Sequence, residues 1–386
     1  MSGRALRLVG ITAAMTGLSL AGALPAASAT PGAASAAKPS WRIVKVVGVS
    51  GGLSQFANVS APGKDNAWVG GFICGSPCST QTAAIYHWDG HAWQAHPVPP
   101  ALVNSPSAPV VSGSSASNVW IFAYGASNRE YAAHVVKGRI TMTELPAMVD
   151  IISAPVFSAT NAWAFGVSTA VEPPVGQYGA HFNGLRWKKV NLPLAPSGVS
   201  ALTSRNIWVY GEALHQVTGQ PTAFLMARWT GHGWRKVALP KLHLGTGYFM
   251  NPNGIVALSP RNVWVTGTLG KGQGIGDGVV LLHWNGKKWT RVFPPYSLSA
   301  FDTDITADGA GGFWVTGYAS RAQHYKGPYL LHYLHGHWSR QLAPTKSGGG
   351  AQFGDLALIP GTTQLWGAAE LLNVAGSQGV IYKYGR

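Results

Sequence analysis

Three segments of the chain combine aromatic rings with polar side chains, the mixture that pockets for small polar ligands such as sugars use. They span residues 243–253, 294–304 and 346–355. The candidate ligand-binding residues in them are Tyr248, Phe249, Asn251, Tyr296, Phe301, Asp302, Asp304, Gln352, Phe353 and Asp355. The alternative is that these aromatic rings only cover the ends of the neighbouring strands.

Catalysis has weaker support in the sequence than binding. A glycoside hydrolase needs two apposed carboxyl groups, and the chain has 13 Asp and Glu residues, of which Asp304 and Asp355 form the best candidate pair. A lyase site could be formed by His243, Tyr248 and Tyr296. Nucleophile-elbow and HExxH motifs are absent from the sequence. We therefore expect a non-catalytic protein and assign no catalytic residue, but a glycan-cleaving hydrolase or lyase stays open.

Metal and phosphate sites are not predicted. Asp302, Asp304 and Asp308 lack the ligand spacing and the terminal Glu of an EF-hand loop. The glycine-rich segment 270–278 joins two expected strands and has no G-K-[ST] sequence. The sequence therefore indicates neither a metal ion nor a cofactor.

The organisation of the chain is set by an internal repeat. Seven tryptophans stand in similar segments such as 204–211 (SRNIWVYG) and 260–267 (PRNVWVTG), 43 to 56 residues apart. These are Trp68, Trp120, Trp163, Trp208, Trp264, Trp314 and Trp366. A second element of the type HWNGKKW (283–289) follows most of them, and Asx-Gly there is typical of hairpin turns. Four short strands per unit of this length predict the blade of a β-propeller.

The ring is expected to close by pairing its two ends. The seventh unit stops after the strand at 379–386 and lacks a fourth strand, whereas residues 41–46 (WRIVKV) resemble the fourth strands WKKV and WRKV of other units. We predict an all-β, seven-bladed propeller with four antiparallel strands per blade, in which 41–46 pairs with 379–386. This pairing would remove an exposed sheet edge.

The repeats resemble the "WAVG…HWNGxxW" units of secreted actinobacterial proteins that are described as β-propellers of the kelch or galactose-oxidase type. The resemblance covers nearly the whole chain after the leader, and its weakest units are 134–140 and 332–338. It implies a propeller fold. It implies no active site, because the pattern of that family, whose function is largely unassigned, carries no catalytic motif.

The repeat also explains most of the aromatic and histidine residues as structural. All 16 tryptophans fall on repeat positions, where large rings should pack between neighbouring blades. One position in the third strand of the unit carries a histidine in five units. These residues are His87, His134, His181, His283 and His332. Five histidines in five separate blades would not converge on a metal.

The N-terminus predicts export. Residues 1–29 have two early arginines, an apolar run and an Ala-Ser-Ala site, as secretory signal peptides do. Residues 30–39 are expected to be a disordered lead-in, and 40–386 a single propeller domain. Cys74 and Cys78 are the only cysteines, and export favours a structural disulfide between them. We therefore expect a secreted protein, a monomer with no membrane span after cleavage of the signal peptide.

The charge balance narrows the choice of partner. Without the leader, 26 Lys and Arg face 13 Asp and Glu, and half of these cations lie on or beside the expected fourth strands. Positive charge there discourages edge-to-edge aggregation, and its surplus favours an anionic partner. No basic patch interleaves with unpatterned aromatic residues, so nucleic acid is not expected. The predicted function is binding of an extracellular or cell-wall glycan or anionic polymer, and a protein-interaction platform is the remaining alternative.

Overall fold

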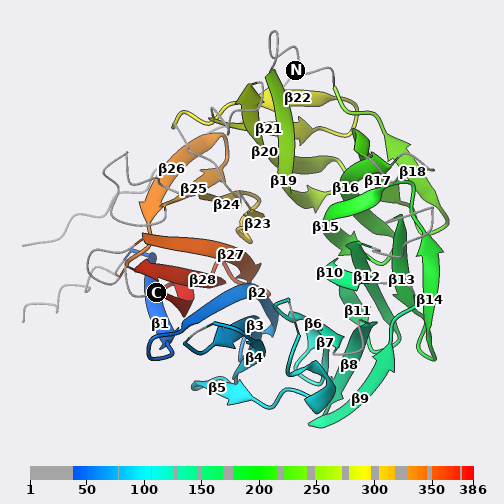
Figure 1. Ribbon diagram of the computed structural model, residues 1–386. Coiled ribbons are helices and arrows are strands. Elements are labelled where there is room, and N and C mark those ends of the chain that lie inside the picture. The colour runs from blue at the N-terminus through cyan, green and yellow to red at the C-terminus, as the bar shows by residue number, and fades with distance from the viewer. Residues whose placement is uncertain are drawn as a thin grey trace, which may run out of the picture. The chain divides into compact units, whose positions relative to one another are not determined.

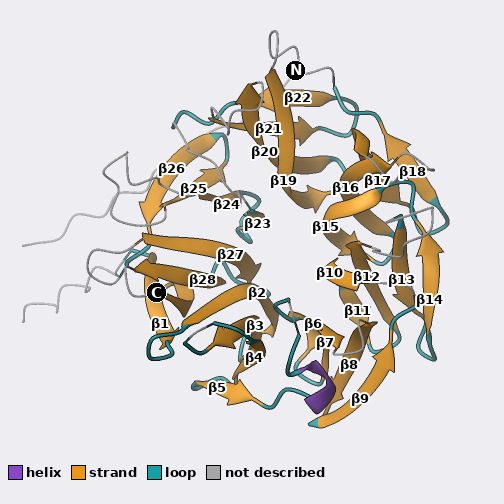
Figure 2. Ribbon diagram, in the orientation of Figure 1, coloured by secondary structure: helices purple, strands orange, loops and turns teal. Residues whose placement is uncertain are grey.

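The repeat units form strands because their apolar and β-branched residues alternate with turn-forming Asx and Gly residues. The computed structural model describes residues 38–386 apart from a set of single residues and loops. The residues not described are 1–37, 77, 106, 126–128, 147–148, 168–176, 215–220, 241–247, 272–277, 297–303, 318–328, 346–349 and 374–375. The described residues contain strands and one short 3-10 helix, η1 (Figure 2).

Residues 38–386 fold into seven antiparallel sheets arranged as a ring, so the predicted seven-bladed propeller is confirmed (Figure 1). Blade 1 consists of β2 (Leu53–Gly63), β3 (Asn66–Cys74), β4 (Gln81–Trp88) and β5 (Trp93–His96). Blade 2 follows η1 (Pro100–Leu102) and consists of β6 (Val110–Ser115), β7 (Asn118–Gly125), β8 (Arg129–Val136) and β9 (Arg139–Glu144). Blade 3 consists of β10 (Val149–Ser153), β11 (Val156–Ser158), β12 (Asn161–Val167), β13 (Tyr178–Phe182) and β14 (Trp187–Asn191), with β10 and β11 both pairing with β12.

The remaining blades follow the same order from the centre outwards. Blade 4 consists of β15 (Ala195–Thr203), β16 (Asn206–Leu214), β17 (Pro221–Trp229) and β18 (Trp234–Val237). Blade 5 consists of β19 (Tyr248–Ser259), β20 (Asn262–Lys271), β21 (Gly278–Trp284) and β22 (Trp289–Val292). Blade 6 consists of β23 (Ile305–Ala307), β24 (Phe313–Gly317), β25 (Tyr329–Leu334) and β26 (His337–Leu342). Blade 7 consists of β27 (Gly350–Leu358), β28 (Leu365–Asn373), β29 (Gly376–Gly385) and β1 (Ser40–Val47).

The closure of the ring is as predicted. β1 pairs antiparallel with β29, with Ser40 opposite Gly385 and Val47 opposite Gly379. β1 therefore becomes the outer strand of blade 7, beside β29 (Figure 1).

The core lies between the blades, where tryptophans of neighbouring sheets meet. Trp120 on β7 contacts Trp187 on β14 of the next blade edge-on, with ring centroids 5.3 Å apart. Trp366 contacts Trp93 in the same way at 5.0 Å across the junction of blades 7 and 1. Each buried ring contributes about 1.5–3 kcal/mol through the apolar surface it removes from water. The expected packing role of these tryptophans is confirmed.

The strand-three histidines are structural, as the repeat indicates. Each bonds through Nε2 to an Asx side chain at or shortly before the start of its blade's second strand, for example His283 to Asn262 at 2.9 Å and His332 to Asp308 at 2.7 Å. His332 also stacks on the ring of Trp314 at 4.2 Å. Burial lowers the pKa of His283, so this ring is neutral near pH 7 and acts as a hydrogen-bonding partner within the blade.

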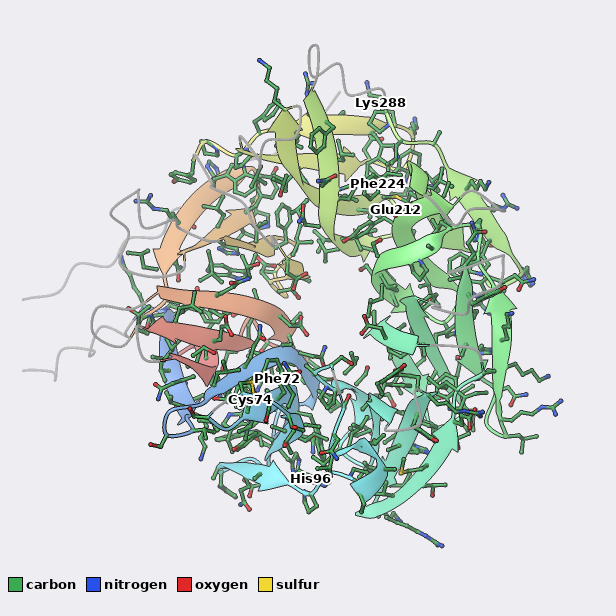
Figure 3. All side chains as sticks on the ribbon, viewed as in Figure 1. Phe72, Cys74, His96, Glu212, Phe224 and Lys288 are labelled. Atoms are coloured by element: carbon green, nitrogen blue, oxygen red, sulfur yellow. A yellow bond between two sulfur atoms is a disulfide. The ribbon has the colours of Figure 1, made fainter. Side chains whose placement is uncertain are left out.

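The predicted disulfide is confirmed. Cys74 at the end of β3 is bonded to Cys78 in the loop that follows (Figure 3). In the described part of the chain, no helix is long and apolar enough to cross a bilayer.

Candidate functional site

One position of the innermost strands faces the central channel in every blade. The position can be found from the tryptophan of each second strand. The residue two places after that tryptophan pairs with this position across the sheet, for example Gly70 with Asn58 and Ala368 with Asp355. Around the ring, from blade 1 to blade 7, the position holds Asn58, Val110, Ser153, Gly198, Gly254, Asp304 and Asp355. All seven residues line the same cavity. Blades 6, 7 and 1 therefore place two carboxyl groups and one amide side by side.

A β-bulge precedes this position in several blades and helps to aim it. The register shifts between Phe56 and Asn58 in β2 and between Phe353 and Asp355 in β27, which leaves one extra residue in each strand. Bulges bend a strand and redirect its side chains. Gly354 is the extra residue in β27, and a Cβ there would lie 2.9 Å from the backbone of Ala57 in blade 1. Glycine thus allows blade 7 to approach blade 1 closely at the site.

Asp355 is held by groups from two blades. Its Oδ2 accepts hydrogen bonds from the Asn58 side-chain amide and from the Val59 backbone N–H, both at 2.9 Å. Its Oδ1 accepts from the Leu356 N–H at 2.7 Å. Asn58 in turn accepts through Oδ1 from the Val111 N–H of blade 2 at 2.7 Å. This network fixes the carboxyl group of Asp355 at the channel wall and links blades 7, 1 and 2.

Asp304 is fixed through its backbone and hydrogen-bonds to Asp355 through its side chain. Its N–H donates to Thr316 Oγ1 at 2.8 Å, and its carbonyl accepts from the Thr316 N–H at 3.0 Å. Its carboxyl group contacts that of Asp355 within hydrogen-bonding reach, which requires one of the two to carry a proton. The structure thus brings together the pair that the sequence singled out.

The electrostatics of the pair follow from this contact. Burial in the channel wall raises the pKa of Asp304 to about 6. Burial and the neighbouring charge of Asp304 raise the pKa of Asp355 well above its ordinary value. Two carboxyl groups that share one hydrogen bond titrate as a unit. The pair therefore holds one proton in mildly acidic solution and loses it at higher pH.

Tyr210 brings a third oxygen to the channel wall from blade 4. Its side chain is buried, and its ring lies so close to Gly198 that a Cβ there would be 2.7 Å from the hydroxyl oxygen. The hydroxyl group makes no hydrogen bond within the described part of the chain, although the residue lines the cavity. Burial, together with the negative charge of Asp304, raises the pKa of Tyr210. Tyr210 is therefore a neutral hydroxyl group facing an acidic wall.

The channel cavity has a volume of about 700 Å³. Among its described lining residues, the only charged side chains are Asp150, Asp304 and Asp355. Neutral polar side chains and two aromatic rings make up much of the rest. They are Gln55, Asn58, Ser60, Ser107, Ser112, Ser153, Ser197, Asn253, Gln352, Tyr210 and Phe353. The cavity is thus polar, acidic and large enough for a ligand of a few rings.

A further acidic residue, Glu130, lies behind the part of the channel wall that Asp150 forms. Glu130 on β8 is buried, and its carboxyl group accepts a hydrogen bond from the Asp150 backbone N–H. Burial raises the pKa of Glu130 to about 8, so this group is largely protonated at neutral pH. Asp150 itself has a backbone φ of 57°, a left-handed conformation that Asp adopts more readily than most residues.

The predicted ligand-binding residues divide into two groups. Phe249 and Asn251 lie on β19 outside the channel lining, with the ring of Phe249 against Gly270. The residues that line the channel are Asp304, Gln352, Phe353 and Asp355. The structure therefore gathers four of the predicted residues at one cavity.

The other predicted residues do not join this cavity in the described structure. Tyr296 packs against the cluster between blades 5 and 6, and the guanidinium of Arg340 lies 5.8 Å from its ring centroid. Tyr248 lies on β19, but the structure does not describe its side chain. His243, Phe301 and Asp302 lie outside the described residues. Asp308, considered with Asp302 and Asp304 for calcium, instead bonds to His332 in a turn.

Sequence reasoning missed Asn58, Tyr210 and Asn253. Asn58 carries the same signal as the two aspartates, because it holds the same repeat position in blade 1. Aligning the innermost strands with one extra residue for the bulge would have found it. Tyr210 comes from a second strand, and only the absence of a side chain at Gly198 lets its hydroxyl group reach the wall.

Comparisons with known proteins agree on the fold. No protein-family model and no curated protein matches the sequence. Among solved structures, YCF48 bound to a D1 peptide aligns with a TM-score of 0.56 and 11% identity, over 91% of this chain and 96% of that one. The WD40 repeats of RRP9 align with a TM-score of 0.56 and 10% identity, over 90% and 99%. At such identities the likeness establishes the β-propeller fold alone.

A third structure differs at the seam. The β-propeller domain of the trilobed protease from Pyrococcus furiosus aligns with a TM-score of 0.54 and 7% identity, over 86% of this chain and 93% of that one. It is described as having an open velcro topology, whereas here β1 pairs with β29. The propeller fold implied by the resemblance to secreted actinobacterial repeat proteins is thus supported, and membership of that family stays a prediction.

Proposed function

We propose that this protein is a secreted binding propeller whose central channel holds part of an extracellular or cell-wall glycan. The observation that supports this most is the cavity of about 700 Å³, to which all seven blades contribute polar groups. A sugar presents many hydroxyl groups, each of which donates and accepts hydrogen bonds. Side-chain amides, hydroxyl groups and a carboxyl pair that shares a proton offer both donors and acceptors.

Export is the second part of the proposal. The predicted signal peptide at residues 1–29 supports it, and so does the disulfide between Cys74 and Cys78, since disulfides persist in oxidising compartments.

Binding suits the carboxyl pair better than glycoside hydrolysis does. Retaining hydrolases hold their two carboxyl groups about 5–5.5 Å apart and inverting ones about 6.5–9.5 Å apart. Asp304 and Asp355 instead interact directly with each other through their side chains, whereas both kinds of hydrolase hold the two groups apart on either side of the substrate bond. The lyase alternative loses support as well, because Tyr296 lies outside the channel lining.

The test is calorimetric titration of the secreted protein with cellotriose, xylotriose, glucosamine trisaccharide and N-acetylglucosamine trisaccharide. At least one should bind, and Ala57→Trp, which places an indole in the cavity, should weaken that binding tenfold or more. Ser117→Trp is the matched control, because Ser117 is exposed in a turn of blade 2 and does not line the channel. Failure of all four saccharides to bind, or unchanged binding by Ala57→Trp, would contradict the proposal.

A second binding function is favoured by the outer edges of blades 3 to 5. Their outer hairpins, residues 178–191, 221–237 and 278–292, contain nine Lys and Arg residues and no Asp or Glu. Lys288, beside the outer strand β22, is one of them (Figure 3). We call these three hairpins the basic arc. A long acid-free surface of this kind suits an anionic wall polymer that the acidic channel would repel.

A further inference from the structure

The charges of this protein are segregated between its centre and its edge. The chain carries 28 Lys and Arg residues against 13 Asp and Glu, yet the described residues that line the channel include three aspartates and no Lys, Arg or His. A cavity that is acidic in a basic protein attracts a positively charged group locally, since exposed charges farther away than about 8 Å are screened at physiological salt.

The contact between Asp304 and Asp355 strengthens the preference of the cavity for a positively charged group. Neither carboxyl group has a cationic side chain among the described residues of the channel wall. Without a proton between them, the two carboxylates repel each other in a partly desolvated site. A bound cation can replace that proton and satisfy both groups at once.

Tyr210 adds a third acceptor from the opposite side of the ring. Its hydroxyl group faces the channel without a hydrogen-bonding partner in the described structure, and its side chain is 2% exposed. The charge of Asp304 acts on it across the channel. The side chain is more than nine-tenths buried, yet its hydroxyl group opens onto the cavity, where a ligand or a water molecule can take the hydrogen bond that the described protein groups do not supply.

We propose that the channel binds the primary ammonium group of its ligand, with N–H donors directed to Asp304 and Asp355, while Tyr210 contacts another part of the same ligand. An ammonium group has three donors on one nitrogen, so it can donate to both carboxyl groups of the pair and keep a donor for another polar group of the wall. The inference rests on the proposed glycan function and narrows the ligand to an amino sugar with a free amine. A lysine side chain offers the same chemistry, and the experiment separates the two sources.

A calcium ion fits this site less well. Calcium takes six to eight oxygen ligands at about 2.3–2.6 Å, and the described residues contain no group of three or more His, Cys, Asp or Glu side chains able to hold a metal. Both oxygens of Asp355 already accept hydrogen bonds from Asn58, Val59 and Leu356. The remaining acceptor capacity suits a hydrogen-bonding cation.

The experiment compares glucosamine trisaccharide, its fully N-acetylated form and the peptide acetyl-Gly-Lys-Gly-amide by calorimetric titration at pH 7. Acetylation removes the charge and keeps the sugar rings. The amine form should bind about tenfold more tightly or better. Its affinity should fall between pH 7 and pH 4.5, because the carboxyl pair takes up protons that compete with the ammonium group, whereas binding of the acetylated form should change little.

Three variants complete the test. Asp304→Asn should weaken binding of the amine form about tenfold or more, and Tyr210→Phe, which keeps the ring, should weaken it severalfold. Asp308→Asn is the control with the same change of charge, because Asp308 lies in a turn outside the channel lining and bonds to His332. It should bind as the unmodified protein does.

The outcomes separate this inference from the proposed function. Equal affinity for the amine and acetylated sugars overturns the ammonium site and leaves the glycan function standing. Binding of the lysine peptide alone overturns the glycan function and supports the ammonium site. Binding of none of the three probes overturns the ammonium site, and the neutral saccharides named above then decide the glycan function on their own. Unchanged affinity of Asp304→Asn for the amine sugar also overturns it.

Discussion

Asn58 and Asp355, 297 positions apart in the sequence, join blades 1 and 7 by a hydrogen bond of 2.9 Å from the Asn58 amide to the Asp355 carboxylate. The same Asn58 side chain accepts from the Val111 N–H of blade 2. The ring seam is therefore held twice: at the outer edge by the pairing of β1 with β29, and at the inner edge by side chains that face the channel.

Replacing Asn58 by Ala should destabilise the fold at this inner seam. The change removes a donor to Asp355 and leaves the Val111 N–H without its acceptor, and hydrogen bonds to charged groups contribute about 1.5–3 kcal/mol each. We expect a loss of about 2–4 kcal/mol in the free energy of unfolding, measured by urea denaturation. Asn191→Ala, in an exposed position of β14, is the control and should change stability little. Equal stability of the two variants would show that the inner network does not support the seam.

Replacing Asp304 by Asn should stabilise the protein near neutral pH. Asn58 shows the arrangement that the introduced amide can adopt, because the Asn58 amide donates to Asp355 and its oxygen accepts a backbone N–H. The pKa of Asp304 in the folded protein is raised to about 6. Ionisation of Asp304 therefore destabilises the folded protein. This destabilisation is absent below the unfolded-state pKa of about 3.9, grows between that pH and about pH 6, and is constant at higher pH.

The expected gain for Asp304→Asn is about 1–3 kcal/mol at pH 7.5, and it should shrink towards zero at pH 4. Thermal unfolding of both proteins across this pH range measures it. The titratable groups that face Asp304 are Asp355 and Tyr210, with Asp150 elsewhere on the channel wall. A stability difference independent of pH would mean that the two carboxyl groups do not share a proton.

The turn of blade 6 offers a matched pair of substitutions. Asp308 accepts hydrogen bonds from the N–H groups of Ala310 and Gly312 and from His332. Asn plays the corresponding role in blade 5, where Asn262 bonds to His283. Asp308→Asn should therefore change the unfolding free energy by less than about 1 kcal/mol, whereas Asp308→Ala should lower it by about 2–4 kcal/mol. Thermal or urea unfolding of the two variants checks this, and similar losses in both would show that the negative charge is needed.

How far the sequence predicts this molecule depends on whether a feature repeats. The strands, the blade count and the pairing of β1 with β29 were predictable, because each tryptophan and each Asx-Gly turn marks the same point of a unit and the missing strand has a recognisable counterpart at residues 41–46. The histidines were predictable as structural for the same reason. Four of their five partners, such as Asn262, are asparagines two residues before the strand-two tryptophan.

The candidate site was only partly predictable because it depends on departures from the repeat. Asp304 and Asp355 stood out as acids on adjacent units, and the structure brings them into contact. Asn58 was hidden by the bulge, which adds a residue to the innermost strand and shifts its alternation. Phe249 and Tyr296 show the opposite error, because an aromatic residue near the start of an innermost strand can equally pack against neighbouring strands.

The basic arc predicts salt-dependent binding to anionic polymer at the outer edge, separate from the channel. Lys188, Arg235 and Lys288 are exposed, one on each outer hairpin of blades 3 to 5. Changing all three to Glu should lower the salt concentration at which the protein elutes from an immobilised anionic polysaccharide. Fewer cationic contacts then remain, so less salt is needed to screen them. The control changes Lys38, Lys64 and Arg386 to Glu, which alters the net charge equally outside the arc. Equal shifts for both triple variants would mean that net charge alone, and no defined surface, governs the binding.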